Sequence, residues 1–265
     1  MSFPLSTKRK GERVNVLIVY CHPEPHSFNH AMFQTACQAL RKKCHKLCVS
    51  DLHRMKFDPV SGRSAYKTVK NPERFRQQLE EMYASERFGF ADFIENEIEK
   101  IEDCDLMIWQ FPLWWCSLPA LLKGWVDRVF AMGRIYGGGH MYETGFCAGK
   151  KALLSLTTGG GMELYQPGGA NGDIMELLKP VLHGTLRFAG FDILTPQIVY
   201  APAKMSSIMR RQVLDAYAER LKKIEAEPLY GEQHAAPQPV IAADHLPGTA
   251  VIMRERFSIT LPYHW

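Results

Sequence analysis

Trp109-Gln110-Phe111-Pro112-Leu113-Trp114-Trp115-Cys116-Ser117-Leu118-Pro119 is the stretch that decides the fold, and it leads into the apolar segment 121–130. Its first residues end an apolar run, 104–110, that is typical of a buried strand. Ser117 and Pro119 stand where a helix cap and a first-turn proline belong, which predicts a helix over 121–130. Two adjacent tryptophans thus lie between a strand's carboxyl end and a helix, where open α/β sheets bind ligands. We therefore expect a flat wall for a planar redox cofactor.

Apolar runs and amphipathic segments alternate along the rest of the chain. Besides 104–110, strands are predicted at 14–20, 45–50, 151–156 and 191–200. Helices are predicted at 28–43, 71–82, 91–102, 172–187 with a break near Pro180, and 206–224. Strands that alternate with helices predict the α/β class, with five strands in a doubly wound parallel sheet and helices on both faces. The expected architecture is flavodoxin-like.

Domain organisation follows from where this alternation holds. It predicts one domain over 14–227, with a helical insertion at about 51–103 and a polar extension at 1–13. After residue 227 repeated prolines interrupt the pattern, although apolar residues persist. Residues 228–265 are interpreted as a C-terminal arm on this or a neighbouring subunit, with a disordered tail as the alternative.

Composition limits the partners and the compartment. The 265 residues include 32 Lys and Arg against 28 Asp and Glu, a net charge of +4 without one broad basic face, so we expect no nucleic-acid partner. The seven cysteines form no Cys-x-x-Cys pair, which favours free thiols in a reducing compartment. No signal peptide is recognisable, and no apolar run approaches about 18 residues. These features predict a cytoplasmic protein without membrane insertion.

Loops that follow three of the predicted strands are expected to line one crevice at the carboxyl edge of the sheet. They are residues 21–29, 112–117 and 157–165. In the first, Ser27, Asn29 and His22 at a helix start suit a phosphate or pyrophosphate, although an ordinary capping turn explains the same residues. In the third, Thr157-Thr158-Gly159-Gly160-Gly161 lets the backbone approach a planar ring, with a merely flexible loop as the alternative.

Two reactive interpretations of the first loop are weak. Cys21 follows the first strand as a phosphatase nucleophile does, but the residue six places on is Ser27, where that chemistry needs Arg. His22, His26 and His30 recur every four residues, but two intervening prolines prevent the helix that would align them as metal ligands.

Four motifs occur in order, at 22–29 (HPEPHSFN), 111–115 (FPLWW), 118–125 (LPALLKGW) and 157–173 (from TTGG to NGD). Together they resemble the NAD(P)H:quinone oxidoreductase (DT-diaphorase) family, over about residues 14–225. The resemblance implies a homodimeric flavoprotein with FAD, rather than FMN, near the subunit interface. It also implies ping-pong hydride transfer that reduces quinones to hydroquinones. NADH, NADPH and a shorter dihydronicotinamide stay open as the donor.

The resemblance also assigns binding roles position by position. The pyrophosphate and adenosine end would use His22, Phe28, Asn29, His30, Ala31 and Arg210. The ring end would use Leu113, Trp114, Trp115, Cys116, Thr157, Thr158, Gly159, Gly160 and Tyr165. The substrate face would combine Trp115 with Tyr136, Met141 and Phe188 from the second subunit.

Catalysis on this interpretation rests on Tyr165 and Asn171. Tyr165 would donate a hydrogen bond where negative charge gathers on the reduced ring. Asn171 stands where many members have His and can only exchange hydrogen bonds, so Tyr165 and water would carry the proton. Cys116 replaces a family Phe and Gly138 a gating Tyr, which widens the pocket. The zinc ligands of one branch have no counterpart, so no metal is expected.

Two alternatives remain open. A flavin slot of this kind also suits an azo or nitro reductase, and some relatives serve as regulatory flavin-binding subunits of a transporter. Rates with matched quinone and azo substrates distinguish the first, and copurification with a membrane partner distinguishes the second.

Overall fold

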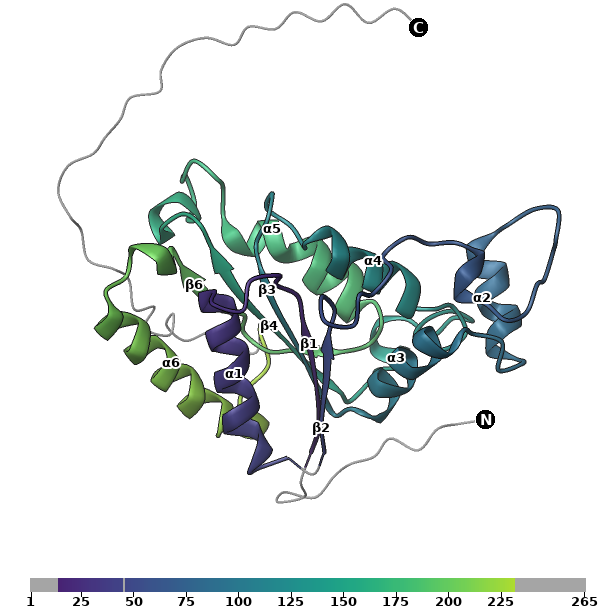
Figure 1. Cartoon of the computed structure of the whole chain (residues 1–265), viewed down its shortest axis with the longest axis horizontal. Coiled ribbons are helices and arrows are strands. Elements are labelled where there is room, and N and C mark those ends of the chain that lie inside the picture. The colour runs from purple at the N-terminus through teal and green to yellow at the C-terminus, as the bar shows by residue number, and fades with distance from the viewer. Residues whose placement is uncertain (1–13, 45, 232–265) are drawn as a thin grey trace, which may run out of the picture.

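In the computed structural model, which describes residues 14–44 and 46–231, six strands form one parallel sheet (Figure 1). They are β1 (Asn15–Tyr20), β2 (Lys46–Asp51), β3 (Leu106–Pro112), β4 (Lys151–Thr158), β5 (Asp192–Ile193) and β6 (Gln197–Tyr200). The spatial order is β2-β1-β3-β4-β5, and β6 also pairs with β4. Because β5 pairs with the start of β4 and β6 with its end, the two share one edge position. The predicted five-stranded flavodoxin-like order is confirmed.

Helices cover both faces of this sheet (Figure 1). One face carries α1 (Phe28–Arg41) and α6 (Ser207–Leu221), and the other carries α3 (Asp92–Asp103), α4 (Ala120–Val129) and α5 (Ile174–Val181). The connection from β1 to β2 crosses one face through α1, whereas the connections that carry α3, α4 and α5 cross the other face. Helices thus cover both faces of the sheet, which confirms the predicted doubly wound α/β arrangement.

β1 explains why helices are needed on both faces. Its Val16 and Ile18 pack in an apolar cluster with residues of α1 and α6, whereas Leu17 and Val19 pack with residues of α3 and α4. All four side chains are buried. A strand that is apolar on both sides is stable only between two covering layers, which is why a continuous apolar run predicts a parallel sheet.

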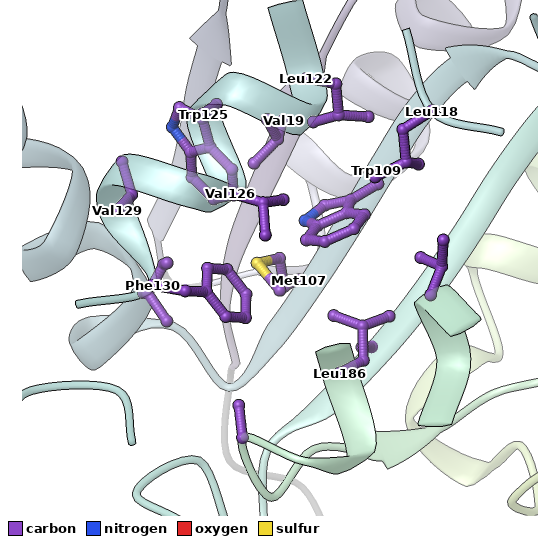
Figure 2. Packing of buried hydrophobic residues seen from close by; sticks show 14 of the residues in the cluster. Val19, Met107, Trp109, Leu118, Leu122, Trp125, Val126, Val129, Phe130 and Leu186 are labelled. Atoms are coloured by element: carbon purple, nitrogen blue, oxygen red, sulfur yellow. The ribbon is translucent and has the colours of Figure 1, made fainter. Parts of the chain in front are cut away.

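Trp109, in the middle of β3, anchors α4 to the sheet (Figure 2). Its ring meets Trp125 with centroids 6.1 Å apart and planes at 89°, and it meets Phe130 at 6.0 Å and 72°. Such edge-to-face pairs add about 0.5–1.5 kcal/mol each beyond the burial of apolar area. Trp125 also donates its Nε1–H to Glu97 Oε2 of α3 at 2.8 Å. These contacts hold the loop between β3 and α4 at the carboxyl edge.

The helix predicted at 121–130 matches α4 within one residue, but its predicted cap was wrong. Pro119 is the N-cap residue and α4 begins at Ala120, without a side-chain cap. The N–H of Ser117 instead donates to the carbonyl of Trp114 at 3.0 Å, which closes a tight turn. Ser117 therefore belongs to the turn and not to the helix start.

Two predicted elements near the C-terminal half change form. The strand predicted at 191–200 is divided into β5 and β6, because Pro196 between them has no N–H to donate to the sheet. The helix predicted at 172–187 does not break at Pro180. It continues through α5 and widens into a π-helix at Leu182–Arg187.

In the predicted insertion, the helix expected at 71–82 is α2 (Gln77–Ser85). Its start is delayed because the N–H groups of Lys70 and Asn71 donate to the buried carboxylate of Glu80, at 2.6 and 3.2 Å. The preceding segment is thereby held as a loop around that carboxylate. The helix expected at 91–102 matches α3 within one residue.

Both predicted terminal segments lie largely outside the described residues. These are the extension 1–13 and, from the arm, residues 232–265. At the described start of the arm, the N–H of Tyr230 donates to the carbonyl of Ile193 at 2.7 Å. Over the ranges that the structure describes, no helix is long and apolar enough to cross a bilayer.

Candidate active site

A cavity of about 820 Å³ opens beside the carboxyl ends of the strands. The structure brings together there the three loops expected to converge, with the segment after β6 as a fourth side. The wall consists of His22, Ser27, Phe28, Asn29, Pro112, Leu113, Trp114, Trp115, Thr157, Thr158, Gly159, Tyr165, Pro202, Ala203 and Arg210.

The first loop is shaped by its own hydrogen bonds. Glu24 Oε1 accepts the N–H of His26 at 2.7 Å, and the N–H of Glu24 donates to His22 Nδ1 at 3.0 Å. Ser27 caps α1 as predicted, because its Oγ accepts the N–H of His30 at 3.1 Å. The first turn of α1 still has N–H groups without intrahelical partners and the positive end of the helix dipole. This corner of the cavity is suited to an anion.

Charge on the wall favours the same ligand class. Arg210, in the first turn of α6, donates its Nε–H to the carbonyl of Met205 at 3.1 Å, and it exposes its guanidinium at the rim. Burial lowers the pKa of His22 below its ordinary value of 6.5, so the imidazole is neutral at pH 7. Among the described residues of the wall there is no Asp or Glu. The wall thus combines the Arg210 cation and the N-terminus of α1 with no carboxylate, which favours an anionic ligand.

A strained turn builds the aromatic side of the cavity. Trp115 and Cys116 both have left-handed backbone, with φ of +51° and +56°, which costs about 1–3 kcal/mol per non-glycine residue. Trp115 is fully exposed, and Trp114 is 45% exposed with its ring 6.0 Å from that of His22. The turn presents two indole rings at the wall instead of burying them, which suits stacking on a planar ligand.

β4 ends in two buried threonines of the wall. Thr158 donates its Oγ1–H to the carbonyl of Gly160 at 2.7 Å, so this hydroxyl supports the loop. A Cβ at Gly159 would meet only open space, whereas one at Gly160 would lie 2.7 Å from Leu164 Cδ1. Gly159 therefore leaves room for a flat ligand, and Gly160 leaves room for its own loop.

Tyr165 lies farther along this loop, lines the cavity and is largely buried. Its ring is 6.1 Å from that of Tyr200, with planes at 41°. The N–H of Asn171 donates to the carbonyl of Leu164 at 2.9 Å, and this bond closes the loop that carries Tyr165. The side chain of Asn171 is exposed and lies outside the wall.

Asn29 connects the first loop to the third. Its buried Nδ2 donates to Thr157 Oγ1 at 2.8 Å, and its Oδ1 accepts from Gln110 Nε2 at 2.9 Å. Both the nitrogen and the oxygen of the Asn29 amide are therefore hydrogen-bonded within the protein. Gln110 could not be predicted as part of the site, because a polar residue within an apolar strand does not reveal which helix it contacts.

Most residues predicted to bind the cofactor reach this cavity, but five positions predicted for the cofactor or for catalysis do not. The residues outside the wall are His30, Ala31, Cys116, Gly160 and Asn171. The ring of His30 instead lies between Tyr20 Oη, at 3.2 Å, and Gln34 Nε2, at 2.9 Å. Pro202 and Ala203 were missed, although they follow β6 and the rule used for the other strand ends covers them.

Tyr136 and Phe188, expected on the substrate face, line a second cavity of about 500 Å³. Their ring centroids are 5.7 Å apart, and Gln78 Nε2 donates to the Tyr136 hydroxyl at 3.3 Å. Met141 is partly exposed and belongs to neither wall. The two cavities share no lining residue. Within one chain, the aromatic wall with Trp115 and the face with Tyr136 and Phe188 therefore belong to different cavities.

Cys21 is unsuited to be a nucleophile. Burial raises the pKa of its thiol to about 12, which disfavours the reactive thiolate at neutral pH. In the part of the chain that the structure describes, no three His, Cys, Asp or Glu side chains are grouped so as to hold a metal ion.

Known proteins share the fold of this chain. The family model described as flavodoxin-like fold matches residues 14–224. Ribosyldihydronicotinamide dehydrogenase (quinone) of Rattus norvegicus is 42% identical over 217 residues, which are 81% of this chain and 94% of that protein. NAD(P)H dehydrogenase (quinone) 1 of Cavia porcellus is 41% identical over 216 residues, which are 81% and 78% of the two chains. A crystal structure assigned as a quinone reductase from Klebsiella pneumoniae is 34% identical with a TM-score of 0.76, covering 82% and 86% of the two chains.

Proposed function

This chain belongs to the family of flavodoxin-like quinone oxidoreductases, and from that premise we propose that it is an FAD-dependent quinone reductase that works as a homodimer. The reaction is the two-electron reduction of a quinone to a hydroquinone by NADH, NADPH or a shorter dihydronicotinamide, in a ping-pong cycle. The cavity that combines an aromatic wall with a helix N-terminus and Arg210 carries this proposal. None of the seven cysteines, all within the described ranges, forms a disulfide, which supports a cytoplasmic location.

The residues of the wall fit a flavin dinucleotide. A volume of about 820 Å³ lies within the roughly 300–1,000 Å³ that is typical of cofactor sites. The first turn of α1 and the guanidinium of Arg210 match the negative charge of a pyrophosphate. Trp114 and the open space at Gly159 match a flat ring. The charged pyrophosphate and the flat ring of the cofactor would thus contact different parts of the wall, each with matching chemistry.

A bound flavin supplies two-electron hydride chemistry. Leu113 and Trp114 would orient the ring by contact. The exposed indole of Trp115 would stack on the nicotinamide and on the quinone in turn, and would exclude water there. The Tyr165 hydroxyl would donate a hydrogen bond at the ring edge and exchange its proton with water. Asn171, exposed on the same loop and outside the wall, would exchange only hydrogen bonds and carry no proton.

A second copy of the chain completes the substrate face. Tyr136 and Phe188 lie on a different cavity from Trp115 within one chain, and Trp115 has its ring fully exposed. We assign Tyr136, Phe188 and Met141 to the partner's first cavity. The active site therefore depends on dimerisation.

The cofactor is tested by purifying the protein, releasing the bound chromophore with heat and identifying it. Anaerobic bleaching of the yellow colour by each reduced nicotinamide then identifies the donor, and turnover with matched quinone and azo substrates identifies the acceptor. Gly159→Leu places a side chain in the proposed ring slot and is expected to abolish flavin retention. Gly62→Leu is the control, because Gly62 is extended at φ 172° with open space around its Cβ position and lies outside the wall. A colourless wild-type protein without quinone turnover contradicts the proposal.

Dimeric completion of the site is tested by mixing variants. Gly159→Leu blocks the chain's own slot, and Phe188→Ala removes the contribution to the partner's slot. Neither homodimer is expected to turn over quinone at the wild-type rate. Mixed dimers regain activity, because one of their two sites combines an intact slot with an intact Phe188. No recovery after demonstrated subunit exchange contradicts the assignment of Phe188 to the partner's site.

A further inference from the structure

Three buried polar side chains connect the core of the sheet to the wall of the first cavity. Gln110 Nε2 donates to Asn29 Oδ1 at 2.9 Å, and Asn29 Nδ2 donates to Thr157 Oγ1 at 2.8 Å. Gln110 lies near the end of β3, Asn29 in the first turn of α1 and Thr157 near the end of β4. The chain of hydrogen bonds thus joins the three elements whose loops form the cavity, and only Gln110 lies outside the wall.

The surroundings of Gln110 fix the direction of this chain. Its Nε2 also lies 3.9 Å from the thioether sulfur of Met32, a weak acceptor. Its Oε1 is buried and has no hydrogen-bond partner in the described part of the protein. Turning the amide over would replace this one unpaired acceptor by an –NH₂ group with both donors unpaired, which costs more. Gln110 therefore donates to Asn29, and Asn29 must turn its nitrogen towards Thr157.

The direction of the amides decides what the Thr157 hydroxyl does. Because Thr157 Oγ1 accepts the hydrogen of Asn29, its own hydrogen is free for another acceptor, and Thr157 lines the cavity. We infer that Gln110 is a positioning residue that, through Asn29, keeps the Thr157 hydroxyl as a hydrogen-bond donor to an acceptor atom of the bound flavin. This inference rests on the proposed function.

A double-mutant cycle on flavin binding tests the inference without any use of catalytic activity. FAD is titrated into the apoprotein of the wild type, Gln110→Met, Thr157→Val and the double variant, and the dissociation constants are compared. Met is close to Gln in shape and replaces the donor by a thioether sulfur, which is a weak acceptor. Asn29 can then turn its nitrogen towards that sulfur and its oxygen towards Thr157, whose hydrogen it accepts. Each single variant is expected to bind FAD roughly three- to tenfold more weakly, as for the loss of one neutral hydrogen bond. The double variant is expected to bind no more weakly than Thr157→Val.

Two controls separate positioning from general damage. Thr157→Ser keeps the hydroxyl and is expected to restore wild-type affinity. Ser155→Ala removes another buried hydroxyl from β4, two residues before Thr157 and outside the wall, and is expected to leave FAD affinity unchanged.

The alternative outcomes are distinct. Additive losses in the cycle, or wild-type affinity of Gln110→Met, overturn this inference alone. A wild-type protein that binds neither FAD nor FMN overturns the proposed function together with it. If Gln110→Met does not fold, Asn29→Asp replaces it in the cycle, because a carboxylate only accepts and draws the Thr157 hydrogen inward. The effect of the Asp charge on FAD binding is the same with and without Thr157→Val, so it cancels in the coupling free energy of the cycle. Additive losses for Asn29→Asp and Thr157→Val would therefore overturn the inference as well.

Discussion

Trp109 of β3 and Trp125 of α4 meet edge to face, with ring centroids 6.1 Å apart and planes at 89° (Figure 2). This contact packs α4 against β3, the two elements that the connection joins. The tight turn that exposes Trp115 lies within that connection, so the buried pair supports the exposed aromatic wall.

Trp125→Ala is expected to lower the free energy of unfolding by about 3–5 kcal/mol, because it leaves a large cavity in the core. Chemical denaturation followed by circular dichroism measures the loss. Trp115→Ala, ten residues earlier and fully exposed, is the matched control and is expected to stay within about 0.5 kcal/mol of the wild type. Equal losses in the two variants would show that the Trp109–Trp125 contact does not anchor the connection.

Tyr165→Phe is expected to slow reduction of the bound flavin by on the order of a hundredfold, as for the loss of one oriented donor. Stopped-flow absorbance in a single anaerobic turnover measures this step. Tyr200→Phe is the control, since Tyr200 lies 6.1 Å away and outside the wall. Unchanged flavin reduction in Tyr165→Phe would remove Tyr165 from the mechanism.

Arg210→Gln is expected to weaken FAD binding roughly ten- to hundredfold, the usual range for a lost hydrogen bond to a charged group. Added salt should narrow the difference, because salt screens an exposed guanidinium. Titration of the apoprotein at two ionic strengths measures both effects. Arg211→Gln removes the same charge from the next residue, which pairs with Asp215 at 3.4 Å, and should bind FAD as the wild type does. Similar affinities for the two variants refute the assigned role of Arg210.

His22 is expected to make the fold less stable in mild acid. Burial lowers the pKa of its imidazole in the folded state, so the unfolded chain binds the proton first as the pH falls. Stability is therefore retained above the ordinary pKa of 6.5 and decreases below it. His22→Gln should flatten this decrease in urea denaturation between about pH 7.5 and pH 5, whereas His26→Gln, at an exposed neighbour, serves as the control. A pH profile that His22→Gln leaves unchanged contradicts the expectation.

The sequence pattern alone was sufficient to predict the strands that are buried on both sides. The apolar runs of β1, β3 and β4 predicted the parallel sheet, because a strand without a polar face must be covered twice. The predicted bounds of helices and strands were wrong where a distant side chain, a proline or a turn outweighed local propensity. Glu80 accepts hydrogen bonds from the N–H groups of residues that precede α2, so this helix begins later than predicted. Pro196 divides the last predicted strand into β5 and β6. Ser117 belongs to the turn after Trp114 and does not cap α4.

The candidate site divides in the same way. The rule that strand ends share one edge predicted from the sequence that His22, Trp114, Thr157 and Tyr165 would meet. The order of motifs likewise indicated the family. Only the tertiary structure decided that Tyr136 and Phe188 line a separate cavity, and that Gln110 reaches Thr157 through Asn29. The physical reason is range: periodicity and capping act between neighbours along the chain, whereas the direction of a buried hydrogen bond depends on side chains that folding alone brings together.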